Sequence, residues 1–170
     1  PEVLKKTERG WTDFGTEEWV MELMDAALRT WKISPDRVYL AGHSMGGYGS
    51  WVLGAHHADR LAGAAPSAGA PTPVYGENGK IIDFMEGVIP NLRNLALRIY
   101  QSTDDPQVPA EANQAAVERV KFAQKEWGGY DMDYWEVDNQ AHALPPGGML
   151  ALIKRLQNIE RKALPKKIIW

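Results

Sequence analysis

The 170-residue sequence predicts an α/β protein, in which a parallel sheet is covered by helices on both faces. Two observations predict this class. Amphipathic stretches with the 3.6-residue period of a helix alternate along the chain with short apolar runs that are typical of buried strands. The length, together with 44% apolar and 24% charged residues, fits a single folded domain with a sizeable core.

The first elements predicted are a helix, a strand and a second helix. The helix begins after the capping-type sequence at residues 13–16 and ends before Pro35, because proline disfavours helical geometry in the residue that precedes it. Its apolar stripe, which we expect to pack in the core, consists of Val20, Leu23, Met24, Ala27, Leu28 and Trp31. A short buried strand is expected at 37–41, and a helix from Gly46 to His57 begins directly after it.

The middle of the chain contains two further predicted strands, at 62–66 and 95–100. Between them lies a stretch rich in proline and glycine, from residue 67 to 91. Loops of this length inside compact domains usually serve a function, so we expect a substrate-facing excursion with a short helix near 81–85.

The last third of the chain predicts a helix at 112–127, closed by glycines at 128–129, and then a strand at 132–137. A final helix is expected to end before Pro165, and residues 166–170 resemble the start of an extended segment. The apolar residues that mark this final helix are Met149, Leu152, Ile153, Leu156 and Ile159.

Composition excludes several classes of function. A formal net charge of -3 provides no general attraction for phosphate backbones, so nucleic acid is not an expected partner. No apolar run approaches the length of a membrane span. The absence of cysteine excludes disulfides, thiolate zinc sites and a cysteine nucleophile, and the sequence indicates no cellular compartment.

One motif carries chemistry. Residues 42–46, Gly-His-Ser-Met-Gly, form a G-x-S-x-G pattern that lies between a predicted strand and a predicted helix. In this context the serine occupies a sharp, strained turn that brings the residues two before and two after it close together, so we expect Gly42 and Gly46 to be required there. The turn would expose the hydroxyl of Ser44, next to the backbone N–H groups that begin the helix.

A serine hydroxyl needs a neighbouring base, which must itself be oriented by a third group. Behind a G-x-S-x-G elbow the chain order is serine, acid, histidine. His142, in the loop after the last predicted strand, is the only histidine that satisfies this order. The acid is not decided by this order, since Asp104, Asp105 and Asp138 all fall between the two. An acidic residue not used in this way would cap the turn that follows its strand.

The motif region resembles a known family. Residues 37–51 look like the nucleophile region of α/β-hydrolase esterases, particularly the branch of polyhydroxybutyrate depolymerases, feruloyl esterases and phospholipase/carboxylesterase-like proteins. Residues 59–69 resemble the segment that follows. The acid segment of these enzymes commonly reads H-G-x-x-D-x-x-V-P, which places Asp105 as the acid, although Gln101 and Ser102 replace the His-Gly pair.

The resemblance implies a serine carboxylic-ester hydrolase that acts on a small-molecule or polymer-borne ester, without a metal or organic cofactor. It assigns Ser44 as nucleophile, His142 as base and Asp105 as the orienting acid, with the Met45 N–H in the oxyanion hole. Two alternatives stay open: a serine peptidase of the prolyl-oligopeptidase type, and a non-catalytic hydrolase fragment that acts in assembly.

The resemblance also bears on domain organisation. Members of the family have several strands before the nucleophile strand, whereas the residues before Val38 leave room for one helix and little else, since a βα unit takes about 30 residues. We therefore expect 1–170 to be a single, partial α/β-hydrolase domain, the C-terminal part of the full fold. The nucleophile strand would then have an exposed edge through which a homo-oligomer could form.

Overall fold

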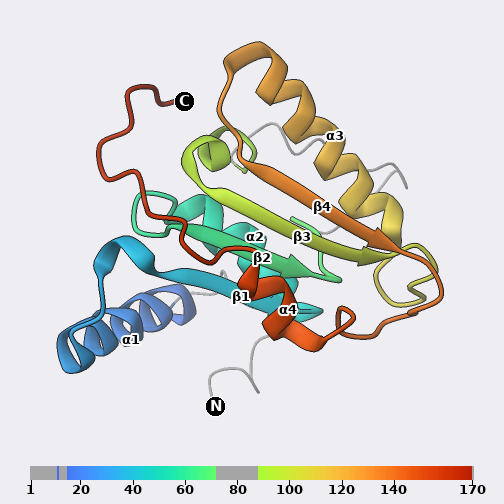
Figure 1. Ribbon diagram of the computed structural model, residues 1–170, viewed down its shortest axis with the longest axis horizontal. Helices are drawn as coiled ribbons and strands as arrows, with labels where there is room; N and C mark the ends of the chain where they lie inside the picture. The colour runs from blue at the N-terminus through green and yellow to red at the C-terminus, as the bar shows by residue number, and fades with distance from the viewer. Residues whose placement is uncertain (1–10, 12–14, 72–87, 170) are drawn as a thin grey trace.

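The computed structural model describes residues 11, 15–71 and 88–169, and it confirms a parallel sheet flanked by helices (Figure 1). The four strands are adjacent in chain order. They are β1 (Tyr39–His43), β2 (Gly63–Ser67), β3 (Ala96–Ser102) and β4 (Met132–Val137). The α-helices are α1 (Thr16–Trp31), α2 (Met45–His56), α3 (Ala110–Trp127) and α4 (Gly148–Lys154). Two short 3-10 helices are η3 (Pro35–Arg37) and η4 (Pro90–Asn94).

All neighbouring strands pair in parallel, so their carboxyl ends lie at one edge of the sheet. The register aligns His43 at the end of β1 with Ser67 at the end of β2, and Ser102 at the end of β3 with Val137 at the end of β4. The segments that follow these strands therefore meet at this carboxyl edge, where open α/β sheets bind their ligands.

Successive side chains along each strand point to opposite faces of the sheet, so the buried residues form two separate cores. On one face, Leu97 and Ile99 of β3 pack with buried residues of α2 and α3. On the other face, Tyr100 packs with Leu152 of α4 and with Leu156 just beyond it. The helices thus cover both faces of the sheet, as the sequence predicts, with α4 in front of the strands in Figure 1 and α2 behind them.

Helix α2 is the most deeply buried helix of the described chain: every residue from Gly49 to Ala55 is buried. Its fully buried Trp51 donates its indole N–H toward the carbonyl of Gly69 at 3.0 Å and toward Oδ1 of Asn113 at 3.1 Å. The indole therefore joins α2 to the loop after β2 and to α3, and its place in the core agrees with the sequence prediction.

Helix α1 departs from its prediction. Its boundaries agree, but it buries only Thr16 and Met21, whereas Leu23 and Trp31 are 56% and 70% exposed. The expectation that the whole apolar stripe packs in the core is wrong for these two residues. The reason is that β1 is an edge strand of the described sheet, so no further strand lies opposite the outer part of α1. A hollow of about 210 Å³ lies among α1, β1, Leu53 of α2 and Leu61.

Several boundaries differ from prediction. The predicted strand at 37–41 begins at Tyr39, because the proline turn continues through η3. The final helix is shorter than expected: α4 ends at Lys154, and turns carry the chain on to Leu156, which is nevertheless buried. No strand forms at 166–169. The helix expected at 81–85 lies outside the described residues.

Candidate active site

Ser44 occupies the turn between β1 and α2 in a strained conformation, with φ 57° and ψ -117°. Its N–H donates to the carbonyl of Ser67 at 2.8 Å, which anchors the turn on β2. A Cβ atom at position 42 would lie 2.3 Å from the carbonyl carbon of Gly46, so only glycine fits there. The matching expectation for Gly46 is wrong, since a Cβ atom at that position would meet nothing within 4 Å.

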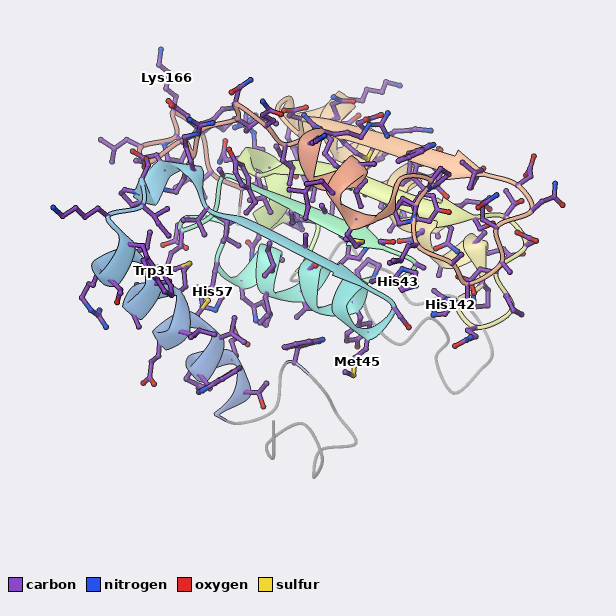
Figure 2. All side chains as sticks on the ribbon, turned by 60° about the horizontal axis from the view of Figure 1, so that its bottom comes forward. Trp31, His43, Met45, His57, His142 and Lys166 are labelled. Atoms are coloured by element: carbon purple, nitrogen blue, oxygen red, sulfur yellow. The ribbon has the colours of Figure 1, made fainter. Side chains whose placement is uncertain are left out.

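Met45 begins α2, so its N–H belongs to the first turn, where backbone donors have no partner within the helix. The main chain of this turn is held from outside by Trp11, whose indole N–H donates to the carbonyl of Met45 at 2.7 Å. Figure 2 shows His43, Met45 and His142 together at the carboxyl edge, with Trp31 and Lys166 at the other end of the molecule.

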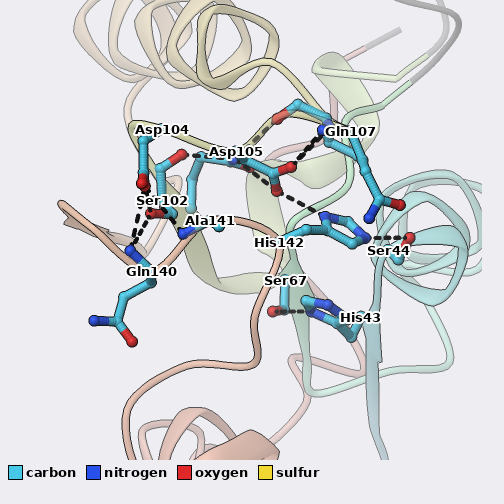
Figure 3. Close-up of polar contacts among 12 residues, drawn as sticks. His43, Ser44, Ser67, Ser102, Asp104, Asp105, Gln107, Gln140, Ala141 and His142 are labelled. Carbon is cyan, nitrogen blue, oxygen red and sulfur yellow. Dashed lines mark hydrogen bonds and ion pairs between the residues drawn. The ribbon is translucent and has the colours of Figure 1, made fainter.

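The imidazole of His142 lies between the two other predicted site residues (Figure 3). Its Nε2 is 2.8 Å from Oγ of Ser44, and its Nδ1 is 2.8 Å from Oδ2 of Asp105. Because an ionised carboxylate can only accept, Nδ1 carries the proton in the neutral ring and Nε2 is free to accept from the serine hydroxyl. Side chains separated by 98 and 37 residues in the sequence are thus joined in one chain of hydrogen bonds.

Of the three candidate acids, Asp105 is the one that contacts His142. Its side chain is completely buried, and Oδ1 accepts the backbone N–H groups of Gln107 at 2.8 Å and Val108 at 2.9 Å. Both carboxylate oxygens are therefore satisfied, one by the backbone and one by the imidazole. Asp138 instead accepts from the hydroxyl of Thr103.

Gln101, which stands where the family commonly has histidine, lies directly beneath this turn. Its amide nitrogen donates to the carbonyl of Val108 at 3.0 Å and lies 3.4 Å from Oδ2 of Asp105. Its oxygen accepts from the side chain of Asn113 at 2.7 Å, and Asn113 in turn accepts from Trp51. Sequence reasoning did not assign this buried network, although a glutamine at the end of an apolar strand is a signal for one.

A second imidazole, that of His43, also lies in the site, and it was not predicted from the sequence. Its ring centroid is 4.9 Å from that of His142, and its Nδ1 is 2.9 Å from Oγ of Ser67. Burial lowers the pKa of His43, and the nearby His142 lowers it further, against opposing effects of the His142 main chain and Asp105. The signal available was its position within the G-x-S-x-G motif.

Within the described residues, no group of three or more histidine or acidic side chains is arranged to hold a metal ion. In the same part of the chain, no helix has the length and apolar character needed to cross a membrane.

Solved structures with a similar fold identify the architecture. A thermostable esterase superposes with a TM-score of 0.67 at 22% identity, over 92% of this chain and 40% of that one. An alpha/beta hydrolase from a deep-sea metagenome library of the Medee basin superposes with a TM-score of 0.60 at 16% identity, over 81% of this chain and 53% of that one. The chain has the α/β-hydrolase fold.

Further similarities lie among esterases. The CE1 ferulic acid esterase AmCE1/Fae1A of Anaeromyces mucronatus matches this α/β-hydrolase chain with a TM-score of 0.57 at 19% identity, over 89% of this chain and 59% of that one. The bifunctional acetylxylan esterase/xylanase XynS20E of Neocallimastix patriciarum is 29% identical over 101 residues, 49% of this chain and 15% of that protein. No family model matches. The chain therefore spans from about one seventh to three fifths of the length of these relatives.

Proposed function

We propose that this α/β-hydrolase chain carries the active site of a serine-dependent carboxylic-ester hydrolase. The observation that supports the proposal is the chain of hydrogen bonds from Ser44 through His142 to the buried Asp105, with two links of 2.8 Å. A strained serine at a strand-to-helix turn, a base within reach and an oriented acid are the parts that nucleophilic acyl transfer requires.

In the proposed reaction, Ser44 attacks the carbonyl carbon of the ester while His142 takes the hydroxyl proton at Nε2. The same proton then goes to the oxygen of the leaving alcohol, and an acyl-serine remains. Water attacks this acyl group in the second half-reaction, again with His142 as base. The bond between the acyl carbon and Oγ of Ser44 then breaks, His142 returns the proton to Oγ, and the carboxylic acid leaves. Asp105 stays ionised throughout and stabilises the imidazolium that forms twice.

The negative charge that develops on the carbonyl oxygen falls beside the start of α2. There the N–H of Met45 is available as a donor, and the helix dipole presents its positive end. A donor of this kind contributes about 3 to 4 kcal/mol to transition-state stabilisation. The proposed mechanism uses side chains, backbone and water, and calls for no metal or organic cofactor.

The substrates proposed are small-molecule or polymer-borne esters. Support comes from similar proteins, which include one described as a ferulic acid esterase and one as an acetylxylan esterase. The assay panel is accordingly 4-nitrophenyl acetate, methyl ferulate and acetylated xylan, with aminoacyl nitroanilides as the amide counterpart.

The decisive experiment combines covalent labelling with turnover. A fluorophosphonate probe should label the wild-type chain and Ser50→Ala, a change at a buried serine inside α2, but not Ser44→Ala. Ser44→Ala should also lower kcat on the preferred ester by about 10⁶-fold.

Other outcomes separate the alternatives. Turnover confined to the nitroanilides would replace the esterase with a peptidase of the prolyl-oligopeptidase type. A folded wild-type chain that resists the probe, turns over none of the substrates and forms a concentration-dependent dimer would favour a non-catalytic role in assembly through the edge of the sheet.

A further inference from the structure

Asp104 stands next to Asp105 in sequence but bonds to a different part of the molecule. Its Oδ1 accepts from the hydroxyl of Ser102 at 2.5 Å and from the backbone N–H groups of Ala141 at 3.1 Å and Gln140 at 3.2 Å (Figure 3). A carboxylate that only capped its own turn would bond to nearby backbone alone. The Asp104 carboxylate accepts from its own backbone N–H, and it also holds a loop 36 and 37 residues away, directly before His142.

The loop that Asp104 holds is strained. Asn139 and Ala141 have φ values of 59° and 47°, in the left-handed region. Asparagine adopts this region more readily than other residues with a Cβ atom, whereas alanine seldom does, so the strain lies mainly at Ala141. Such conformations persist only where the surroundings hold them in place. Successive N–H groups in a turn of this kind form a concavity that binds an anion, and here the Asp104 carboxylate fills it.

We propose that Asp104 is a positioning residue, whose carboxylate fixes the backbone of residues 139–141 so that His142 reaches both Ser44 and Asp105. The inference rests on the proposed function. The two adjacent acids then have different roles. Asp105 orients the imidazole ring through its Nδ1, while Asp104 sets the path of the main chain that carries the ring.

The charge of Asp104 supports this assignment. The hydrogen bond from Ser102 lowers the pKa of Asp104, and the N–H groups of Ala141 and Gln140 act in the same direction, against a smaller effect of desolvation. The carboxylate is therefore ionised at neutral pH. Hydrogen bonds to an ionised acceptor are stronger than those to a neutral one, as is needed to hold a strained loop.

The test compares three variants by kcat and KM for 4-nitrophenyl acetate and by the pH profile of kcat/KM. Asp104→Ala removes the acceptor and should lower kcat by about 10²-fold with little change in KM, since small misplacements of a base are costly. It should also shift the acid limb of this profile. Asp104→Asn keeps an oxygen for the same donors and should recover part of the rate.

The matched control is Asp138→Asn, which removes charge from the same loop at a residue that accepts from Thr103. It should change kcat less than either Asp104 variant. Near-UV circular dichroism establishes that each variant is folded. If Asp104→Ala does not fold, the comparison is made with Asp104→Asn alone. An unchanged rate and pH profile in the folded Asp104 variants would overturn the inference, as would an equal loss in Asp138→Asn.

Hydrogen exchange separates failure of this inference from failure of the proposed function. Removing the Asp104 acceptor should accelerate exchange of the Ala141 amide most, since the Gln140 amide also lies 3.2 Å from Oγ of Ser102. Asp138→Asn should leave both amides protected. This readout needs no turnover, so it applies even if the wild-type chain proves inactive on every ester. Equal exchange in wild type and Asp104→Ala would overturn the role of Asp104 in the loop.

Discussion

The carboxyl edge of the sheet and the contact between α1 and β1 are held together in different ways. At the edge, Asp105, Gln101 and Asn113 are buried and hydrogen bonded to one another or to backbone. In the other region, α1 and β1 line a hollow together with Leu53 of α2, and Leu23 and Trp31 of α1 lie largely in solvent. Partly exposed ion pairs also join α1 to the chain at the end of α2. One region depends on directional bonds among buried groups, and the other on partial packing and partly exposed ion pairs.

This difference determines where the molecule tolerates substitution. Hydrogen bonds among buried groups require particular atoms at particular positions, so their loss leaves unsatisfied polar groups. Apolar contact at a half-covered surface is graded and non-directional. We therefore expect large effects of substitution at the carboxyl edge and small ones along α1, and the predictions below test that contrast.

The largest effect is expected at Gly42. Alanine there would place its Cβ atom 2.3 Å from the backbone of Gly46, and backbone on both sides of the turn would have to move. We expect Gly42→Ala to lower the free energy of unfolding by about 3 kcal/mol, measured by urea denaturation, and to abolish fluorophosphonate labelling.

Gly46→Ala is the matched control, because a Cβ atom at that position meets nothing within 4 Å. Alanine is favoured over glycine inside a helix by about 1 kcal/mol, so this variant should be at least as stable as wild type. Equal destabilisation by the two alanines would contradict the asymmetry between the two ends of the motif.

A smaller effect is expected from Asn113→Ala. The change removes the donor to the Gln101 oxygen and one of the two acceptors near the Trp51 indole. Leaving a buried oxygen unsatisfied should lower the free energy of unfolding by about 2 kcal/mol.

The matched control at the surface is Asp25→Asn, which breaks an ion pair between α1 and Arg60. Both side chains are about one third exposed, so the loss in the free energy of unfolding should be less than about 1 kcal/mol. The reverse order, by urea denaturation, would contradict the comparison.

The same contrast explains which parts of the fold could be predicted. Strand and helix order follows from local patterns, and β4 has the predicted boundaries because its residues alternate and turn signals flank them. The exposure of Leu23 and Trp31 could not be predicted. Helical periodicity indicates which side chains share a face of the helix, but not how much of the sheet lies opposite that face. That depends on the neighbours of β1, which its own sequence does not specify.

The candidate site was partly predictable for a related reason. The elbow motif and chain order predict that Ser44 and His142 meet, and the resemblance to the esterase acid segment singles out Asp105. The three side chains lie within hydrogen-bond distance, while their catalytic roles stay a prediction. The parts contributed by Asp104 and His43 were not predictable. They depend on how the loop after β4 crosses the ends of β1 and β3, a relation between distant segments that no local pattern encodes.

Along α1, polar substitution of exposed apolar residues should have little effect on stability. Leu23→Gln and Trp31→Gln should each change the free energy of unfolding by no more than about 0.5 kcal/mol, because both side chains are already mostly in solvent. Urea denaturation at a low protein concentration checks this. A loss above about 1.5 kcal/mol would mean that the outer face of α1 is covered in solution.

The smallest effect expected at the carboxyl edge is a pH dependence of stability due to His43. Burial lowers the pKa of His43 in the folded chain, so below its ordinary value of about 6.5 the unfolded chain binds more protons than the folded one. The contribution of His43 is therefore complete above pH 6.5, and it is lost as the pH falls from 6.5 through the lowered pKa. The effect is modest because the ring is only partly buried.

Comparison of wild type with His43→Gln by urea denaturation at pH 8.0 and pH 5.5 isolates this contribution. The groups that face the ring, His142 and Asp105, are present in both proteins, as are His56 and His57 beside Glu17, so their direct effects largely cancel in the difference. Wild type should lose more stability on acidification than the variant. An equal loss would mean that His43 is protonated as readily in the folded chain as in the unfolded one, and the carboxyl edge would then be more open to water than its hydrogen bonds indicate.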